Sequence, residues 1–263
     1  MPASALHTIM LPVRGDGKGD NVLAHAAVLA KRFAARVRVV HCHPKTEDLM
    51  PFGVVIPNML RKQIEEAASR NVDVTREQMT EGFRVLARDL GLADQDHEAG
   101  KATARFIEYE GKQVDAVKQF GRLADLICVA QPDRSTKLGF NTLKSALFAS
   151  GRPVMMCPHL DSVPEDLGRH VAIGWNGSLE ASRAATAEDL VRYLELKGVQ
   201  SNIRAFAPKS GVVGEQLLWE TAASGADLLV MGAYHDSYER ESLFGGNSQI
   251  VVDRAQFPVV MVH

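Results

Sequence analysis

The residues with the clearest chemical potential lie in the stretch MGAYHDSYERESLFGGNSQIVVDR, close to the end of the chain. Gly232 closes an apolar run there, and Gly245 and Gly246 precede a sequence typical of a helix start. Unpaired N–H groups at a helix N-terminus attract anions, and glycines let the backbone approach a phosphate closely. Asn247 or Ser248 could cap this helix or contact the phosphate. The pattern predicts a phosphate-binding loop, and the alternative is an ordinary glycine-containing loop before a capped helix.

The elements that would hold such a loop occur twice along the chain. Apolar runs closed by Gly, Pro or Asn alternate with helical patterns, which predicts β-α-β units and a parallel sheet covered on both faces. Three segments of the first copy match three of the second: IMLPVRGDG (9–17) and VAIGWNGSL (171–179), ADLICVAQP (124–132) and ADLLVMGAY (226–234), and RPVMMCPH (152–159) and FPVVMVH (257–263). The repeat predicts two tandem α/β domains, each an open, Rossmann-like parallel sheet. We place the first domain at 1–160 and the second at 168–263, with a polar boundary at 159–168.

The second copy is about 60 residues shorter than the first between its first strand and its ADL strand. In that interval the first copy has a strand pattern at 36–44, a long amphipathic pattern across 59–90 and a short strand pattern after it. The second copy has only a helix at 179–196, stopped by Gly198, and the run 198–211, for which we expect one strand and a loop. The second domain is therefore predicted to have lost about one strand and one helix.

The composition is that of an ordinary globular protein. The hydrophobic content is 46%, and the net charge is −2, which gives no electrostatic case for nucleic acid or an anionic membrane as a partner. Cys42, Cys128 and Cys157 lie in apolar runs without paired spacing, which favours a reducing compartment over a disulfide framework. With no secretory signal pattern and no membrane-spanning run, we expect a cytoplasmic protein.

The strand pattern, the WNGS motif after the first strand of the second copy, the loop described above and the closing PVVMVH together resemble the universal stress protein family in its tandem form. ATP-binding members of that family carry Gly, two residues, Gly, nine residues, then Gly and Ser or Thr. Gly232 and Gly245 match this pattern, whereas His235 replaces the second glycine. Gly246 occupies the hydroxyl position, and Ser248 follows two residues later. The resemblance implies an adenine-nucleotide alpha-hydrolase-like fold and a site for ATP, ADP or AMP, with Mg, in the second domain.

The resemblance also places the adenine end of the ligand. Asn176, Gly177 and Ser178 follow the first strand of the second domain, and Asn176 stands where the family has an Asp. An Asn can hydrogen-bond to an adenine or ribose edge, although it carries no charge. The second strand, which forms part of the base pocket in the family, falls in the shortened interval.

The first domain has the opposite pattern, with its strands kept and its loop changed. Its loop is AQPDRSTKLGFNTLKSA (130–146), in which Asp133 and Phe140 lie over His235 and Gly245. A carboxylate and a bulky ring are unfavourable in a phosphate cradle, so we expect no nucleotide in the first domain.

Two further groups of residues were considered for chemistry. Strand alternation puts His41 and His43 on one face and Cys42 on the other, but no pair of potential ligands has a spacing typical of a zinc site. His235 beside Asp236 lacks a nucleophile as partner, so no catalytic residue is assigned. The leading hypothesis is a non-catalytic stress-response or regulatory module.

Two alternatives remain open from the sequence. One is a slow ATP hydrolase, in which Asp236 or Glu239 would hold the metal, and the other is a ligand-free interaction scaffold. The family resemblance further implies that the last strands of the two domains pair antiparallel, as an intramolecular pseudo-dimer, and it also allows a homodimer through helix faces. An unpaired apolar edge strand would be a liability, which favours that pairing.

Overall fold

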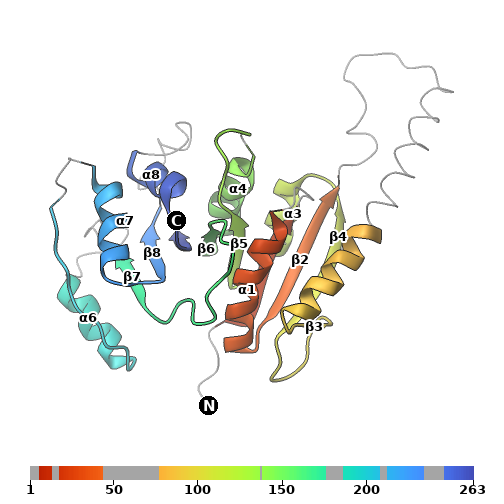
Figure 1. Ribbon diagram of the computed structural model, residues 1–263, viewed down its shortest axis with the longest axis horizontal. Coiled ribbons are helices and arrows are strands. Elements are labelled where there is room, and N and C mark those ends of the chain that lie inside the picture. The colour runs from red at the N-terminus through yellow and green to blue at the C-terminus, as the bar shows by residue number, and fades with distance from the viewer. Residues whose placement is uncertain are drawn as a thin grey trace.

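Nine strands join in one sheet in the computed structural model, and helices flank the sheet on both faces (Figure 1). The strand order is β3-β4-β2-β1-β5-β6-β9-β8-β7, and all neighbours are parallel except β6 and β9. The structure describes residues 6–13, 18–43, 77–136, 138–175, 186–207, 212–233 and 246–263. This arrangement confirms the predicted α/β class with a mostly parallel sheet.

The first half of the sheet contains every strand predicted for it. Its elements are β1 (Thr8–Val13), α1 (Gly19–Phe33), β2 (Arg36–His43), β3 (Ala93–Asp94), β4 (Thr103–Glu110), α3 (Gln113–Gly121), β5 (Leu126–Ala130), α4 (Phe140–Ser150) and β6 (Val154–Cys157). A further helical stretch covers 77–89, which confirms the described part of the helix expected across 59–90. The two-residue edge strand β3 was not predicted, because two residues are too few to form a recognisable pattern.

The second half of the sheet is shorter, as expected. It consists of β7 (Val171–Gly174), α6 (Ala187–Leu196), α7 (Val213–Ala223), β8 (Leu228–Gly232), α8 (Gly246–Arg254) and β9 (Val259–Val262). Gly198 has a φ of +75° just after α6, which confirms the predicted stop. The described part of the predicted helix at 179–196 is likewise helical from 187 onward.

The strand predicted within 198–211 is wrong for its described part, since no residue of 198–207 belongs to a strand. These residues are all exposed and reach α7 instead of the sheet. The Arg204 guanidinium lies 6.0 Å from the Trp219 ring centroid, and its Nε lies 2.6 Å from a Glu220 carboxylate oxygen. A short apolar run becomes a strand only where a partner edge is available, and here side-chain contacts with a helix have taken precedence.

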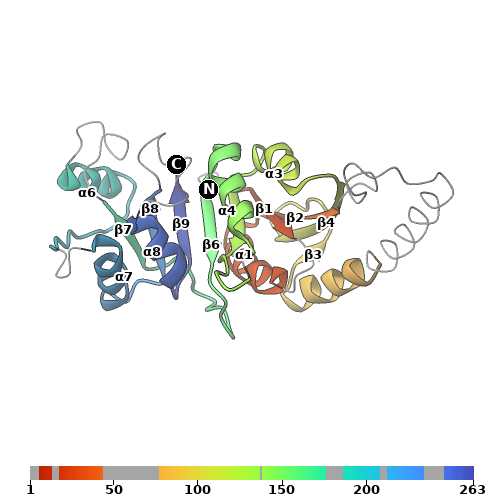
Figure 2. The same cartoon turned by 90° about the horizontal axis from the view of Figure 1, so that it is seen from above.

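The two halves meet through their last strands. In the antiparallel pairing of β6 and β9, Val154 lies opposite Met261 and Met156 lies opposite Val259. Figure 2 shows these strands side by side in the middle of the sheet. The expected antiparallel pairing is thereby confirmed, and it makes the sheet continuous from one half to the other.

Two apolar clusters fill the space between the sheet and its helices. One lies under α1 and includes Ile9, Leu11 and Leu23, while the other lies under α3, α4 and α8 and includes Leu143 and Val251. The second cluster runs across the β6–β9 junction and so packs the two halves together. Burial of this kind of surface contributes roughly 25 cal/mol per Å² and is the main stabilising contribution.

The face of the second half that corresponds to the α1 side is thinly covered. Ile9 and Leu11 of β1 are fully buried beneath α1, whereas the matching Val171 and Ile173 of β7 are 40% and 43% exposed. The reason is that α6, the counterpart of α1, contributes no buried residue. In Figure 2, α6 lies on the opposite side of the second half from α7 and α8.

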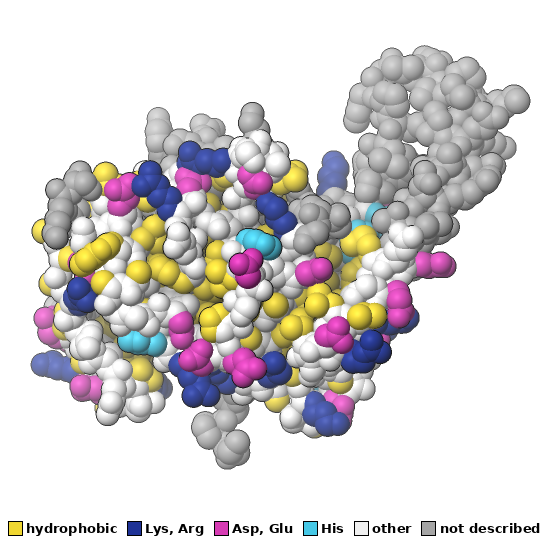
Figure 3. Space-filling model, viewed as in Figure 1, with side chains coloured by type: hydrophobic (Ala, Val, Ile, Leu, Met, Phe, Trp, Pro, Cys, Tyr) yellow, Lys and Arg dark blue, Asp and Glu magenta, His cyan; other side chains and the backbone are white. Residues whose placement is uncertain are grey.

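The surface carries both signs of charge. Figure 3 shows basic and acidic side chains interspersed over the visible face, in keeping with the net charge of −2. Among the described helices, none combines the length and the apolar character that crossing a membrane would require.

Candidate functional site

The carboxyl edge of β8 and the N-termini of α7 and α8 come together in the second half, where the phosphate loop was predicted. Gly232 is the last residue of β8, and Gly246 is the first residue described in α8. In α/β sheets this edge is where ligands bind. Five of the predicted site residues lie outside the described residues: Asn176, Gly177, Ser178, His235 and Gly245.

No described residue crowds the two described glycines at this edge. A Cβ built on Gly232 or on Gly246 has no described atom within 4 Å. Neither residue has a positive φ, so no left-handed backbone requires glycine there. Close approach of a ligand to the backbone, the role predicted for these glycines, fits this geometry.

The first turn of α8 has the electrostatics of an anion site. This turn contains no acidic residue, and the basic residue in the last turn of α8 is Arg254. The first N–H groups of a helix have no acceptor within the helix, which makes them donors suited to an anion. Ser248 is half-buried in the same turn, where a hydroxyl can supply one more donor.

Asn247 makes a contact that the sequence did not predict. Its Oδ1 accepts a hydrogen bond of 3.0 Å from the N–H of Gly214, in the first turn of α7. A Cβ on Gly214 would lie 2.6 Å from the carbonyl oxygen of Asn247, so the two helix starts approach as closely as glycine permits. The side chain of Asn247 therefore joins α7 to α8 and caps the neighbouring helix, which was not evident from the local sequence because the partner is distant in the chain.

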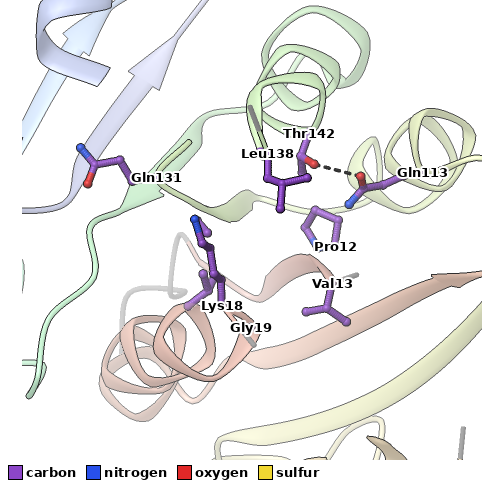
Figure 4. Close-up of a pocket in the computed structure, with 11 residues that line it drawn as sticks. Pro12, Val13, Lys18, Gly19, Gln113, Gln131, Leu138 and Thr142 are labelled. Atoms are coloured by element: carbon purple, nitrogen blue, oxygen red, sulfur yellow. Dashed lines mark hydrogen bonds between the residues drawn. The ribbon is translucent and has the colours of Figure 1, made fainter. Parts of the chain in front are cut away.

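The equivalent edge of the first half is closed by its own side chains. A small cavity lies between the end of β1, the start of α1 and the start of α4 (Figure 4). Thr142 donates a hydrogen bond of 2.9 Å to Gln113 across it, and Leu138 projects into it. The cavity volume of about 30 Å³ has room for about two waters, whereas a nucleotide-sized ligand needs several hundred.

In the first-half loop, the carboxylate of Asp133 takes the place that a bound anion would have. Its N–H donates to the carbonyl of Leu138 at 3.0 Å, which closes the loop on itself. Its carboxylate accepts hydrogen bonds from the hydroxyl and the N–H of Ser135, at 2.7 and 2.8 Å, and lies 3.5 Å from the Lys18 ammonium. The hydroxyl of Ser135, followed by its N–H, holds the pKa of this carboxyl well below its usual range. Lys18 was not singled out from the sequence, because nothing in its neighbours predicts a partner so far along the chain.

The histidine and cysteine residues considered for a metal site lie as strand alternation predicts. The ring centroids of His41 and His43 are 6.3 Å apart. Cys42 packs against the apolar cluster that lies under α3, α4 and α8. Cys128 and Cys157 are buried in the core, and burial raises the pKa of the Cys157 thiol. In the part of the chain that the structure describes, no group of three or more His, Cys, Asp or Glu residues could hold a metal ion.

No family model matches the sequence, and no curated protein matches it. Solved structures, in contrast, match nearly the whole chain. A universal stress protein from Archaeoglobus fulgidus has a TM-score of 0.66 at 14% identity, and the match covers 97% of this chain and 95% of that one. The fold is that of the universal stress proteins. A Pseudomonas aeruginosa structure, provisionally described as a universal stress protein, has a TM-score of 0.51 at 12% identity and covers 100% and 95% of the two chains.

A further Pseudomonas aeruginosa protein, described as functionally unknown, has a TM-score of 0.50 at 13% identity, with 99% of this chain and 93% of that one covered. All three likenesses extend over both halves of the sheet. Within the universal stress protein fold, the first half of this chain keeps its strands and has a closed loop. The second half has fewer described strands, and no described atom lies within 4 Å of a Cβ built on Gly232 or Gly246.

Proposed function

We propose that the protein is a tandem member of the universal stress protein family and acts as a non-catalytic stress-response module. In this proposal it binds ATP, ADP or AMP, with Mg, at the carboxyl edge of its second half. The fold likeness over 97% of the chain supports the first part. The single observation that carries the second part is the contrast between the two halves. No described atom lies within 4 Å of a Cβ at Gly232 or Gly246, whereas in the first half Leu138 lines a small cavity and its carbonyl accepts a hydrogen bond from the N–H of Asp133.

The phosphates would lie at the start of α8. The backbone at Gly232 and Gly246 leaves them room, and the first-turn N–H groups of α8 with the hydroxyl of Ser248 would donate to them. Gly245 and His235 would complete the loop, as the sequence pattern predicts. Asn176, Gly177 and Ser178 would take the adenine or ribose end, where an amide can read a base edge without charge.

A charge placed at the start of α8 tests this assignment. Gly246→Asp puts a carboxylate where the phosphates should lie, yet an acidic residue in a first turn favours the helix itself. We expect Mg-ATP affinity, measured by equilibrium dialysis, to fall at least about tenfold, because like charges a few Å apart repel by more than about 1 kcal/mol.

The chain offers a matched control in its first half. Asn141 occupies the position in α4 that Gly246 occupies in α8, and it is exposed. Asn141→Asp should therefore leave the affinity unchanged. Equal losses in the two variants, or no loss in Gly246→Asp, would show that the phosphates do not lie at α8. No measurable nucleotide binding to the wild type would leave the ligand-free scaffold as the better account.

A further inference from the structure

The loop that follows β5 in the first half reaches across to α8 in the second. The side-chain amide of Gln131 donates to the carbonyl of Val252 at 2.7 Å and to that of Ala255 at 3.3 Å. Carbonyls at the end of a helix have no partner within the helix, so an external donor satisfies them. In Figure 4 the Gln131 amide points away from the first-half cavity.

Arg134, from the same loop, holds the same end of α8. Its Nε donates to Oδ1 of Asp253 at 2.8 Å, and a second guanidinium nitrogen contacts Oδ2, so the pair is bidentate. The Asp253 side chain is only 16% exposed and also accepts a hydrogen bond of 2.6 Å from Gln249. A cation near a helix C-terminus is further favoured by the helix dipole.

Among the described residues, the repeat gives the Gln131 contact no equivalent on the other side. The N–H of Gln131 bonds to the carbonyl of Cys157 at 2.8 Å, as that of Ala233 bonds to Val262 at 2.8 Å, so Gln131 and Ala233 are counterparts. Ala233 has no amide to donate from its side chain. The counterpart of Asp253 in α4 is Phe148, whose ring meets the edge of His263 with centroids 4.7 Å apart. Within the part of the chain that the structure describes, this polar contact thus runs from the first half onto the second.

We propose that Gln131 and Arg134 are positioning residues that hold α8 by its C-terminus and so fix the N–H groups at its other end for an anion. The loop that is closed to ligands in the first half thereby supports the ligand edge of the second half, and nucleotide binding there is coupled to the first half. This inference rests on the proposed function for its ligand, but the contact itself is independent of any ligand.

The first experiment follows amide hydrogen exchange without ligand. Gln131→Glu keeps the shape of the side chain and turns its donor into an acceptor facing two carbonyls, and Arg134→Ala removes the bidentate pair. We expect the double variant to exchange the amides of α8 about tenfold faster or more, because two or more hydrogen bonds are lost, with α4 unchanged. Unchanged exchange in α8, or equal acceleration in α4 and α8, would overturn the proposal. His263→Ala is the comparison variant: it removes the ring contact with Phe148 of α4 and the Nδ1 hydrogen bond to the carbonyl of Ala233, and it should speed exchange in α4 but not in α8.

The second experiment measures Mg-ATP affinity at a temperature where every variant is folded. The double variant should bind Mg-ATP about three- to tenfold more weakly. The Mg-ATP affinity lost in Arg134→Asp should return towards the wild-type value when Asp253→Arg is added, because the second change re-forms the ion pair with its charges exchanged. Loosened α8 with unchanged affinity would overturn the positioning role. If the wild type bound no nucleotide, the proposed function and the positioning role would both fail, while the exchange experiment would still report on the contact.

Discussion

Replacing Gly214 by alanine should destabilise the protein even though alanine is the better helix former. A Cβ at this position would lie 2.6 Å from the carbonyl oxygen of Asn247 and 3.2 Å from its Cα, so α7 and α8 must move apart. Overpacking of this kind costs about 1–3 kcal/mol, and weakening the Gly214–Asn247 hydrogen bond costs about 1 kcal/mol more. The gain in helix propensity is about 0.5–1 kcal/mol. The free energy of unfolding should therefore fall by about 1–3 kcal/mol.

The assay is urea unfolding of Gly214→Ala beside Gly246→Ala. A Cβ on Gly246 meets no described atom within 4 Å, so the same chemical change should leave stability equal or raise it by up to about 1 kcal/mol. Opposite signs for the two variants are the expected result. If Gly214→Ala were as stable as Gly246→Ala, the close approach of the two helix starts would not exist, and the role given to Asn247 would be refuted.

Two further predictions concern packing and pH. Leu11→Ala should cost about 2–5 kcal/mol of unfolding free energy, whereas Ile173→Ala at the matching, 43% exposed position should cost about 1 kcal/mol or less, and equal costs in urea titrations would contradict the uncovered face of β7. Burial lowers the pKa of His25, and its Nε2 has no hydrogen-bond partner among the described residues, so the unfolded state binds the proton more readily. Stability should therefore be full above pH 6.5 and fall as the pH drops below it, with His41, whose pKa is also lowered by burial, contributing in the same direction. His25→Leu should flatten this dependence between pH 7 and 5, and an unchanged slope would show that His25 does not cause it.

Much of the fold could be predicted because buried parallel strands leave continuous apolar runs in the sequence. The described part of the run at 9–17 lies in β1, that of the run at 226–234 contains β8, and the repeat of the closing strands agrees with their antiparallel pairing. The same reasoning failed over 198–207, the described part of the run at 198–211. Whether such a run pairs depends on a free partner edge and on competing contacts such as that of Arg204 with α7, and neither is written in the local pattern.

The site was predictable only in part, for a related reason. Gly232 and Gly246 lie at the end of β8 and at the start of α8, where the sequence pattern placed them. The role of Asn247 depends on how closely α7 approaches, and the role of Gln131 depends on how the two halves meet at β6 and β9. Contacts between residues far apart in the chain follow from docking geometry, which a single sequence does not encode in any local motif.

The number of nucleotides bound per chain tests the account most directly. Purified protein would be heat-denatured, and the ATP, ADP and AMP in the supernatant would be quantified, before and after saturation with Mg-ATP. One nucleotide per chain is expected, because side chains of the first half leave only a small cavity at its own loop edge, and binding should raise the melting temperature. Two nucleotides per chain would contradict the closure of the first half by Asp133 and Leu138, and none would contradict the proposed site at α8.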